Sequence, residues 1–91
     1  MDLKWSKKAL TDIGRLYEFL ETVDKRVAVQ TIQMLTAAPT KLLTNPRIGE
    51  KIEEFLPREL RRLLIGHFEL RYKIKSNTIY VLRLWHTREN R

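Results

Sequence analysis

The 91-residue sequence contains no cysteine, only three glycines and three prolines, and fewer acidic than basic side chains. The lack of cysteine excludes disulfide frameworks, zinc ribbons and thiol catalysis, and favours a reducing compartment. No apolar run approaches the roughly 18 residues that a membrane helix needs, so we expect a cytoplasmic protein without membrane contact. The sequence has no glycine-rich phosphate loop, metal-ligand cluster or nucleophile triad. We therefore expect no cofactor and no metal.

The length and the charge suggest a single basic domain spanning residues 1–91. Hydrophobic residues make up 43% of the chain and charged residues 32%, which is typical of a globular protein. Lysine and arginine total 18 against 11 acidic residues, and the last third, residues 60–91, has eight basic and only two acidic side chains. This imbalance predicts an acidic partner, such as a nucleic acid or an acidic protein.

The first half of the sequence predicts a helical hairpin after a short strand at residues 2–5. Apolar residues recur every three or four positions over residues 7–22, and Ser6 is the expected N-cap. Asp24 is the expected N-cap of a second helix, in which Pro39 predicts a break near residues 36–39. Asn45-Pro46 ends the helical region, and residues 46–58 are typical of a loop held to the core by Ile48, Ile52 and Phe55.

The second half predicts three strands, at residues 59–65, 68–75 and 78–86. Residues 68–75 alternate strictly between apolar and charged, and Gly66-His67 and Ser76-Asn77 have the length of tight hairpin turns. The expected fold is therefore α+β, with the order β-α-α-β-β-β. A helical hairpin would pack on one face of a small antiparallel sheet.

Two-residue loops would fix the register of both hairpins, with Tyr72 opposite Val81, Leu70 opposite Arg83 and Glu69 opposite Leu84. The register in turn fixes which side chains share a face of the sheet. The face away from the helices would then carry apolar side chains that no helix of this chain covers, and we expect a partner protein to bind them: Tyr80, Leu82 and Leu84. The same face would carry the candidate anion-binding residues Arg62, Arg71, His86 and, just beyond the strand, Arg88.

Arg62 would oppose Arg71 across two strands, and this like-charge pair costs stability unless an anion binds there. His86, close to Arg88, could perform acid–base chemistry on a phosphate ester, although a strand-end histidine is more often structural.

Three residues are expected to be structural. Arg83 would lie on the helix-covered side of the sheet, where a buried arginine needs an acidic partner. Asp12 or Glu18 of the first helix could supply that carboxylate. Trp85 would fill the core.

Several segments together resemble the RelE/ParE superfamily of bacterial toxins: Ala9, Asp12-Ile13, Tyr17, residues 45–49 (Asn-Pro-Arg-Ile-Gly), Leu60-Arg61, Leu70-Arg71-Tyr72 and residues 81–88 (Val-Leu-Arg-Leu-Trp-His-Thr-Arg). The resemblance covers nearly the whole chain. It implies a small basic toxin of a type II toxin–antitoxin module, a plasmid-stabilisation and growth-inhibition system, with the β-α-α-β-β-β fold. An acidic antitoxin would neutralise it, with a heterotetramer as a possible assembly.

The superfamily contains two activities, and the resemblance favours the ParE-like one, inhibition of DNA gyrase without catalysis. The alternative is a RelE-like mRNA interferase acting on the ribosome and its mRNA. Arg62 matches a basic phosphate-contact position of these nucleases, Arg88 matches a catalytic arginine, and His86 would match a C-terminal histidine that some nuclease relatives use. The candidate catalytic residues that this alternative implies are therefore Arg62, His86 and Arg88. Glu69, however, stands where the nucleases have an arginine, and we expect no RelE-like tail with a catalytic tyrosine after Arg91. A stand-alone RNA-binding module is a third hypothesis, but only Tyr80 would be an exposed stacking aromatic.

Overall fold

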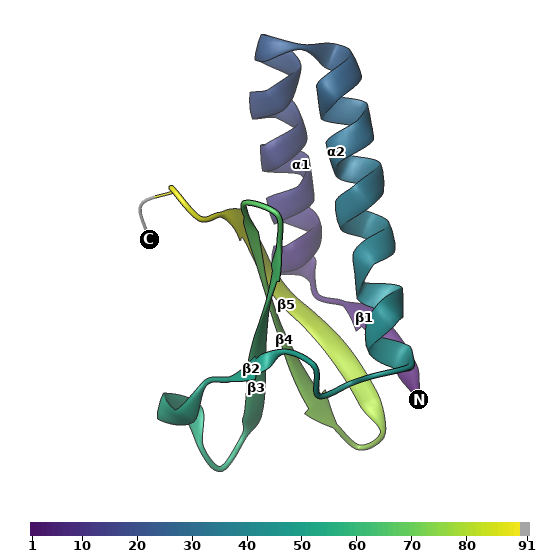
Figure 1. Ribbon diagram of the computed structural model, residues 1–91, viewed down its shortest axis with the longest axis vertical. Helices are drawn as coiled ribbons and strands as arrows, with labels where there is room; N and C mark the ends of the chain where they lie inside the picture. Colours follow the sequence, from purple (N-terminus) through teal and green to yellow (C-terminus); the bar gives the residue numbers. More distant parts are fainter. Residues whose placement is uncertain (90–91) are drawn as a thin grey trace.

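The computed structural model describes residues 1–89 and has two helices packed against a five-stranded sheet (Figure 1). The elements are β1 (Asp2–Trp5), α1 (Lys7–Val23), α2 (Lys25–Ala37), the 3-10 helix η1 (Ala38–Leu43), β2 (Glu50–Lys51), the 3-10 turn η2 (Glu53–Phe55), β3 (Glu59–Ile65), β4 (Phe68–Lys75) and β5 (Thr78–His86). The strand order is β1-β5-β4-β3-β2. All pairs are antiparallel except β1 with β5. The expected α+β fold is confirmed, and β2 and η2 lie within the expected loop.

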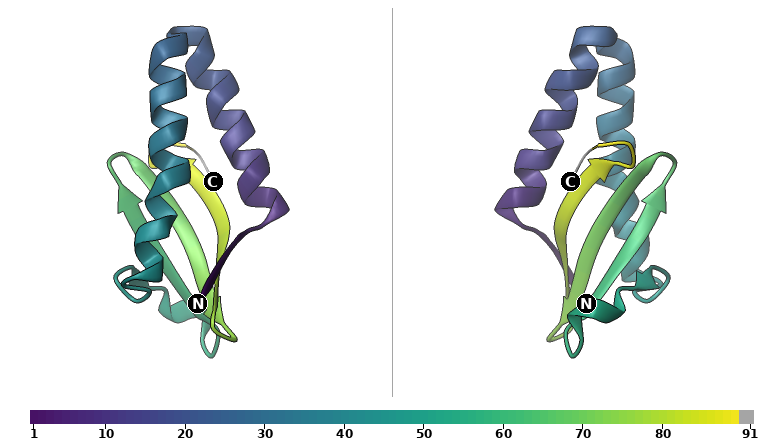
Figure 2. Two further views of the ribbon diagram at one scale, coloured as in Figure 1. Left: turned by 90° about the vertical axis from the view of Figure 1, so that its right-hand side faces the viewer. Right: turned by 90° about the vertical axis from the view of Figure 1, so that its left-hand side faces the viewer.

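The helical hairpin covers one face of the sheet and leaves the other face without a helix (Figure 2). Both predicted N-caps are present: the Ser6 hydroxyl accepts from the Ala9 N–H, and the Asp24 carboxylate accepts from two N–H groups of α2. The α-helical geometry ends at Ala37, and Pro39 lies in the tighter turn of η1. The break that proline predicted is therefore confirmed.

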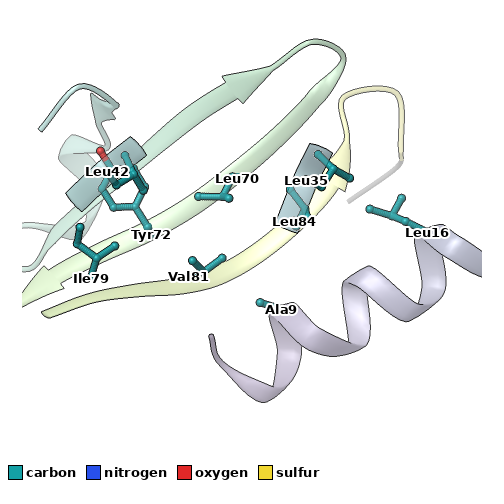
Figure 3. Close-up of a cluster of buried hydrophobic side chains, with 9 residues drawn as sticks. All are labelled: Ala9, Leu16, Leu35, Leu42, Leu70, Tyr72, Ile79, Val81 and Leu84. Carbon is teal, nitrogen blue, oxygen red and sulfur yellow. The ribbon is translucent and has the colours of Figure 1, made fainter. Parts of the chain in front are cut away.

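The core lies between the hairpin and the sheet (Figure 3). Its fully or nearly fully buried members come from both helices, η1, β4 and β5: Ala9, Leu16, Leu35, Leu42, Leu70, Tyr72, Ile79, Val81 and Leu84. Ile52 is also buried, as the sequence suggested, but Ile48 is 59% exposed. The expectation that Ile48 holds the loop to the core is therefore wrong.

Both hairpins have the two-residue turns that the sequence predicted. Gly66 has a positive φ of 59°, and Ser76 and Asn77 have φ values of 52° and 58°. A positive φ at the first turn position, or at both, matches the right-handed twist of the flanking strands. The pairing of β3 with β4 follows the expected register throughout, including Arg62 opposite Arg71.

The pairing of β4 with β5 contains a β-bulge that the sequence analysis did not anticipate. Tyr72 pairs with Val81 as expected, but Arg71 pairs with Arg83, so Leu82 has no register partner in β4. One extra residue reverses the facing of every side chain beyond it. The expected pairs of Leu70 with Arg83 and of Glu69 with Leu84 are wrong, since Leu70 pairs with Leu84 and Glu69 with Trp85.

Tyr72 anchors the segment between η1 and β2. Its buried hydroxyl donates to the Pro46 carbonyl at 2.7 Å and accepts from the Gly49 N–H at 3.0 Å. Burial raises the pKa of Tyr72, so the neutral hydroxyl is the stable form.

Within residues 1–89, no helix is long and apolar enough to cross a membrane.

We predict that Gly49→Ala destabilises the protein. A Cβ at this position would lie 2.6 Å from the Tyr72 hydroxyl oxygen and 2.7 Å from the Arg62 carbonyl oxygen. The backbone must therefore shift, at a cost of about 1–3 kcal/mol. Gly14 of α1 is the matched control, because a Cβ there meets nothing within 4 Å. Gly14→Ala should raise stability by about 0.5–1 kcal/mol. Urea unfolding measures both, and equal effects of the two substitutions would contradict this close packing.

Candidate functional site

Three arginines lie side by side across the face of the sheet that no helix covers. Arg62 of β3 pairs with Arg71 of β4, which in turn pairs with Arg83 of β5. We call these three residues the arginine row. The bulge at Leu82 completes the row, because without it Arg83 would face the helices. The sequence analysis placed Arg62 and Arg71 correctly and placed Arg83 on the wrong face.

Each member of the arginine row has its own carboxylate. The Nε atoms of Arg62 and Arg71 donate to Glu50 at 2.7 Å and to Glu69 at 3.0 Å. Because Glu50 is 68% exposed, its bond to Arg62 is open to competition from solvent and ligands. Carboxylates of the chain itself thus offset the repulsion between the arginines on adjacent strands.

Aromatic rings support the cations of the same face. The Arg71 guanidinium carbon lies 4.9 Å from the centre of the Trp85 ring, and that of Arg83 lies 5.9 Å from it. Lys73 similarly places its ammonium 5.0 Å from the Tyr80 ring. Such contacts favour cations and shield the rings from solvent. Trp85 is buried, as expected, but on the face opposite the helices rather than in the core between helices and sheet.

The predicted ion pair between Arg83 and Asp12 is confirmed. Arg83 donates to the two Asp12 carboxylate oxygens at 2.9 and 3.2 Å. The same carboxylate accepts from the Leu84 N–H at 2.8 Å and from Arg15 at 3.3 Å. Burial by itself raises the pKa of Asp12, but these donors outweigh it and hold the pKa below its usual value.

Side chains close the edge of β5 beyond the end of β1. Ser6 donates to the Leu82 carbonyl, Asp12 accepts from the Leu84 N–H, and Arg15 donates to the Leu84 carbonyl at 3.2 Å. Glu89, which follows the strand, accepts from the His86 N–H at 2.7 Å. Three of these four residues are the N-cap of α1, Ser6, and two residues of the helix itself, Asp12 and Arg15. That stretch therefore replaces a strand along this edge, which would otherwise expose unpaired backbone groups.

The bulge also turns His86 toward the helix-covered side, so its expected place on the open face is wrong. The His86 ring packs edge-on against Phe68, with centroids 5.2 Å apart, and stacks on His67. Its Nδ1 accepts from the Arg88 N–H at 3.1 Å. Arg62, in contrast, lies on the opposite face of the sheet. The structure therefore does not bring together the three candidate catalytic residues Arg62, His86 and Arg88.

The apolar part of the expected partner surface is smaller than the sequence suggested. Leu84 is fully buried in the core, so its expected place on the uncovered face is wrong. Tyr80 and Leu82 remain partly exposed. Leu64 is 63% exposed on the same face, but it lies on β3, in register with Glu69 and Trp85, and β4 separates it from Tyr80 and Leu82. The described residues contain no group of three or more His, Asp or Glu side chains that could hold a metal ion.

The site is thus a face of the sheet on a small α+β domain that carries arginines paired with carboxylates and supported by aromatic rings. Over residues 3–91 the sequence matches the family described as the ParE toxin of the type II toxin–antitoxin system parDE. The chain therefore belongs to the ParE toxin family and is a ParE-like toxin of a type II toxin–antitoxin module, which implies an antitoxin partner.

A solved structure agrees with this fold. A chain of the chromosomal ParDE TA system from P. aeruginosa superposes with a TM-score of 0.81 at 22% sequence identity, covering 94% of this chain and 95% of that chain. No curated protein sequence gives a significant match.

We predict that Asp12→Asn lowers the free energy of unfolding by about 1.5–3 kcal/mol at neutral pH, because charged hydrogen bonds to Arg83 and Leu84 are weakened. Folding lowers the pKa of Asp12, so the carboxylate stabilises the protein above the unfolded-state value of about 4. This stabilisation is lost as the pH falls through the lower, folded-state value.

Urea unfolding between pH 7 and pH 2 checks the prediction. The stability gap between the wild type and Asp12→Asn should shrink as the pH falls below about 4. Glu18→Gln, which removes an exposed carboxylate from the same helix, is the control for net charge and should change stability by less than about 0.5 kcal/mol. A gap that stays constant with pH would show that the carboxylate charge does not provide the stabilisation.

Proposed function

We propose that this ParE-family toxin inhibits DNA gyrase by binding to it, without catalysing a reaction, and that an acidic antitoxin neutralises it. The separation of Arg62 from His86 and Arg88 is the main support. A nuclease needs its acid–base group and its phosphate-binding cations around one phosphate. Here the histidine packs on Phe68 at one side of the sheet, and the arginine row lies on the other. A gyrase inhibitor acts in the cytoplasm, so the proposal also places the protein there.

The electrostatics of the arginine row also favour binding over cleavage. Phosphodiester cleavage builds up negative charge in the transition state, and cations free to approach it lower the barrier. In this chain, the Nε groups of Arg62, Arg71 and Arg83 already donate to carboxylates. Glu69, which is only 13% exposed, would repel a phosphate near Arg71.

The same face suits an acidic segment of the antitoxin. Carboxylates of such a segment could replace Glu50 at Arg62 and approach Arg71 and Lys73. Its apolar side chains would cover Leu64 together with the partly exposed Tyr80 and Leu82. On this face the arginine row lies between Leu64 and Tyr80, so apolar and charged contacts would alternate across the interface. Leu84 is removed from this proposed surface because it is buried.

Expression of the chain without its antitoxin should arrest growth, and the purified protein should inhibit DNA supercoiling by gyrase. We expect DNA damage responses to appear while translation initially continues. His86→Ala should retain gyrase inhibition at matched folded concentration, because the proposal assigns the imidazole no chemical step. Prompt cleavage of ribosome-bound mRNA by the wild type, lost in His86→Ala or Arg88→Ala, would instead establish the RelE-like alternative.

We predict that Arg71→Gln weakens antitoxin binding about fivefold at low salt, because it removes one cation from the interface. Arg26→Gln is the matched control, since Arg26 is an exposed arginine at the start of α2, remote from the sheet face. Titration calorimetry at two salt concentrations measures both variants. An Arg71→Gln affinity equal to that of Arg26→Gln would place the antitoxin on another surface.

A further inference from the structure

A second surface lies on the helix-covered side, between α1 and the ends of β4 and β5. It is a groove of about 430 Å³. Its apolar lining comes from Leu16, Phe19 and Leu20 of α1 and Phe68 of β4. Phe19 is 66% exposed, whereas Leu16, three residues earlier on the same helix, is buried in the core. Volumes of this size accommodate drug-sized ligands or a few side chains of a binding segment.

One rim of this groove carries charge. Arg15 and Glu89 form an ion pair there, and Arg88 lies beside them. Arg15 is held in place by its bonds to Asp12 and to the Leu84 carbonyl, and its other terminal nitrogen meets Glu89. The Glu89 carboxylate therefore pairs with the Arg15 guanidinium, which is held in place at the rim of the apolar groove.

The turn that carries Glu89 is attached to the end of β5 by two hydrogen bonds and to the turn between β3 and β4 by a third. Glu89 accepts from the His86 N–H at 2.7 Å through its other oxygen, and its own N–H donates to the His86 carbonyl at 2.9 Å. The Thr87 N–H donates to the His67 carbonyl at 2.8 Å. These bonds fix the position of the carboxylate, so the Arg15–Glu89 pair is a built contact rather than a chance surface encounter.

We propose that the groove binds an apolar segment of the acidic antitoxin and that a carboxylate of this segment pairs with Arg15. In the free toxin, Glu89 pairs with Arg15 in place of this carboxylate. The inference rests on the proposed function and deepens it with a second contact surface. Charge complementarity supports the choice of occupant: an apolar lining beside Arg15 and Arg88 matches an acidic amphipathic segment. Binding would exchange the intramolecular ion pair for an intermolecular one.

The consequence is a built-in competition for Arg15. While Glu89 is in place, an incoming carboxylate must displace it, so the affinity of the groove for apolar anions is lower than its lining would permit. Glu89→Gln removes the competing charge and keeps the side-chain oxygen that accepts from the His86 N–H. Arg15→Gln removes the cation itself.

Two fluorescent probes test the groove independently of any partner. 1-Anilinonaphthalene-8-sulfonate is an apolar anion, and N-phenyl-1-naphthylamine has the same rings without the sulfonate. Glu89→Gln should bind the sulfonate about three- to tenfold more tightly than the wild type, and Arg15→Gln should bind it about as much more weakly. The neutral probe should bind all three proteins alike, which also reports that the groove is intact in the variants. Glu53→Gln removes a carboxylate from η2, away from this groove, and should leave both affinities unchanged.

If Glu89→Gln binds the sulfonate probe no more tightly than the wild type does, the proposed competition between Glu89 and an incoming anion for Arg15 is wrong. The antitoxin arm of the experiment then identifies the occupant: antitoxin added to wild-type toxin should displace the sulfonate probe. A complex that forms and leaves the probe bound would overturn this inference alone and leave the proposed antitoxin contact on the sheet face standing. Failure to form any complex would instead overturn the proposed neutralisation together with this occupant.

Discussion

The carboxylate of Asp12 is the contact on which the arrangement of helix and sheet depends. It is buried, and it accepts from two side chains and one backbone N–H: Arg83, Arg15 and Leu84. Strand β1 ends at Trp5, so the second half of β5 has no strand on the edge away from β4. Side chains of Ser6 and α1 take over the hydrogen bonds of this edge. The contacts that dock α1 on the sheet are therefore the same contacts that close this edge of β5. They also set the position of the core residues that α1 contributes.

Much of the fold could be predicted from the sequence, because it follows from local chemistry. The caps at Ser6 and Asp24, the effect of Pro39 and the two-residue turns each depend on a few neighbouring residues. The pair between Asp12 and Arg83 was predicted from an Arg83 buried under the helices. The partner is correct but that reason is wrong, because Arg83 lies on the other face of the sheet with its side chain 36% exposed, and the buried group of the pair is Asp12.

The bulge at Leu82 could not be deduced from the pattern of β5. Ile79 and Val81 alternate as core residues should, and Leu84 falls one position out of phase. Either a strand that is apolar on both faces or an inserted residue explains this pattern. The first explanation predicted an uncovered Leu84, whereas the second, which the structure contains, places it in the core. One residue thus decides the facing of Arg83, Trp85 and His86. Glu89 and Arg15 were missed for a different reason, since an isolated acidic residue in a basic segment carries no distinctive spacing.

The two surfaces of the toxin share one physical device, an arginine already paired with a carboxylate of the same chain. Exchange of one such carboxylate for another changes the Coulomb energy little, because an ion pair is lost for each one gained. Charges arranged in this way favour fast association and the correct partner more than they raise affinity. The free energy of binding must then come mainly from apolar surface, and each side offers some, at Leu64 and at Phe19, both more than 60% exposed. A partner that carried only negative charge would form ion pairs with Arg62 and Arg15 no stronger than those that Glu50 and Glu89 already form. In this proposal the antitoxin is therefore recognised by the combination of acidic and apolar side chains, and a polyanion such as RNA would lack the second of these.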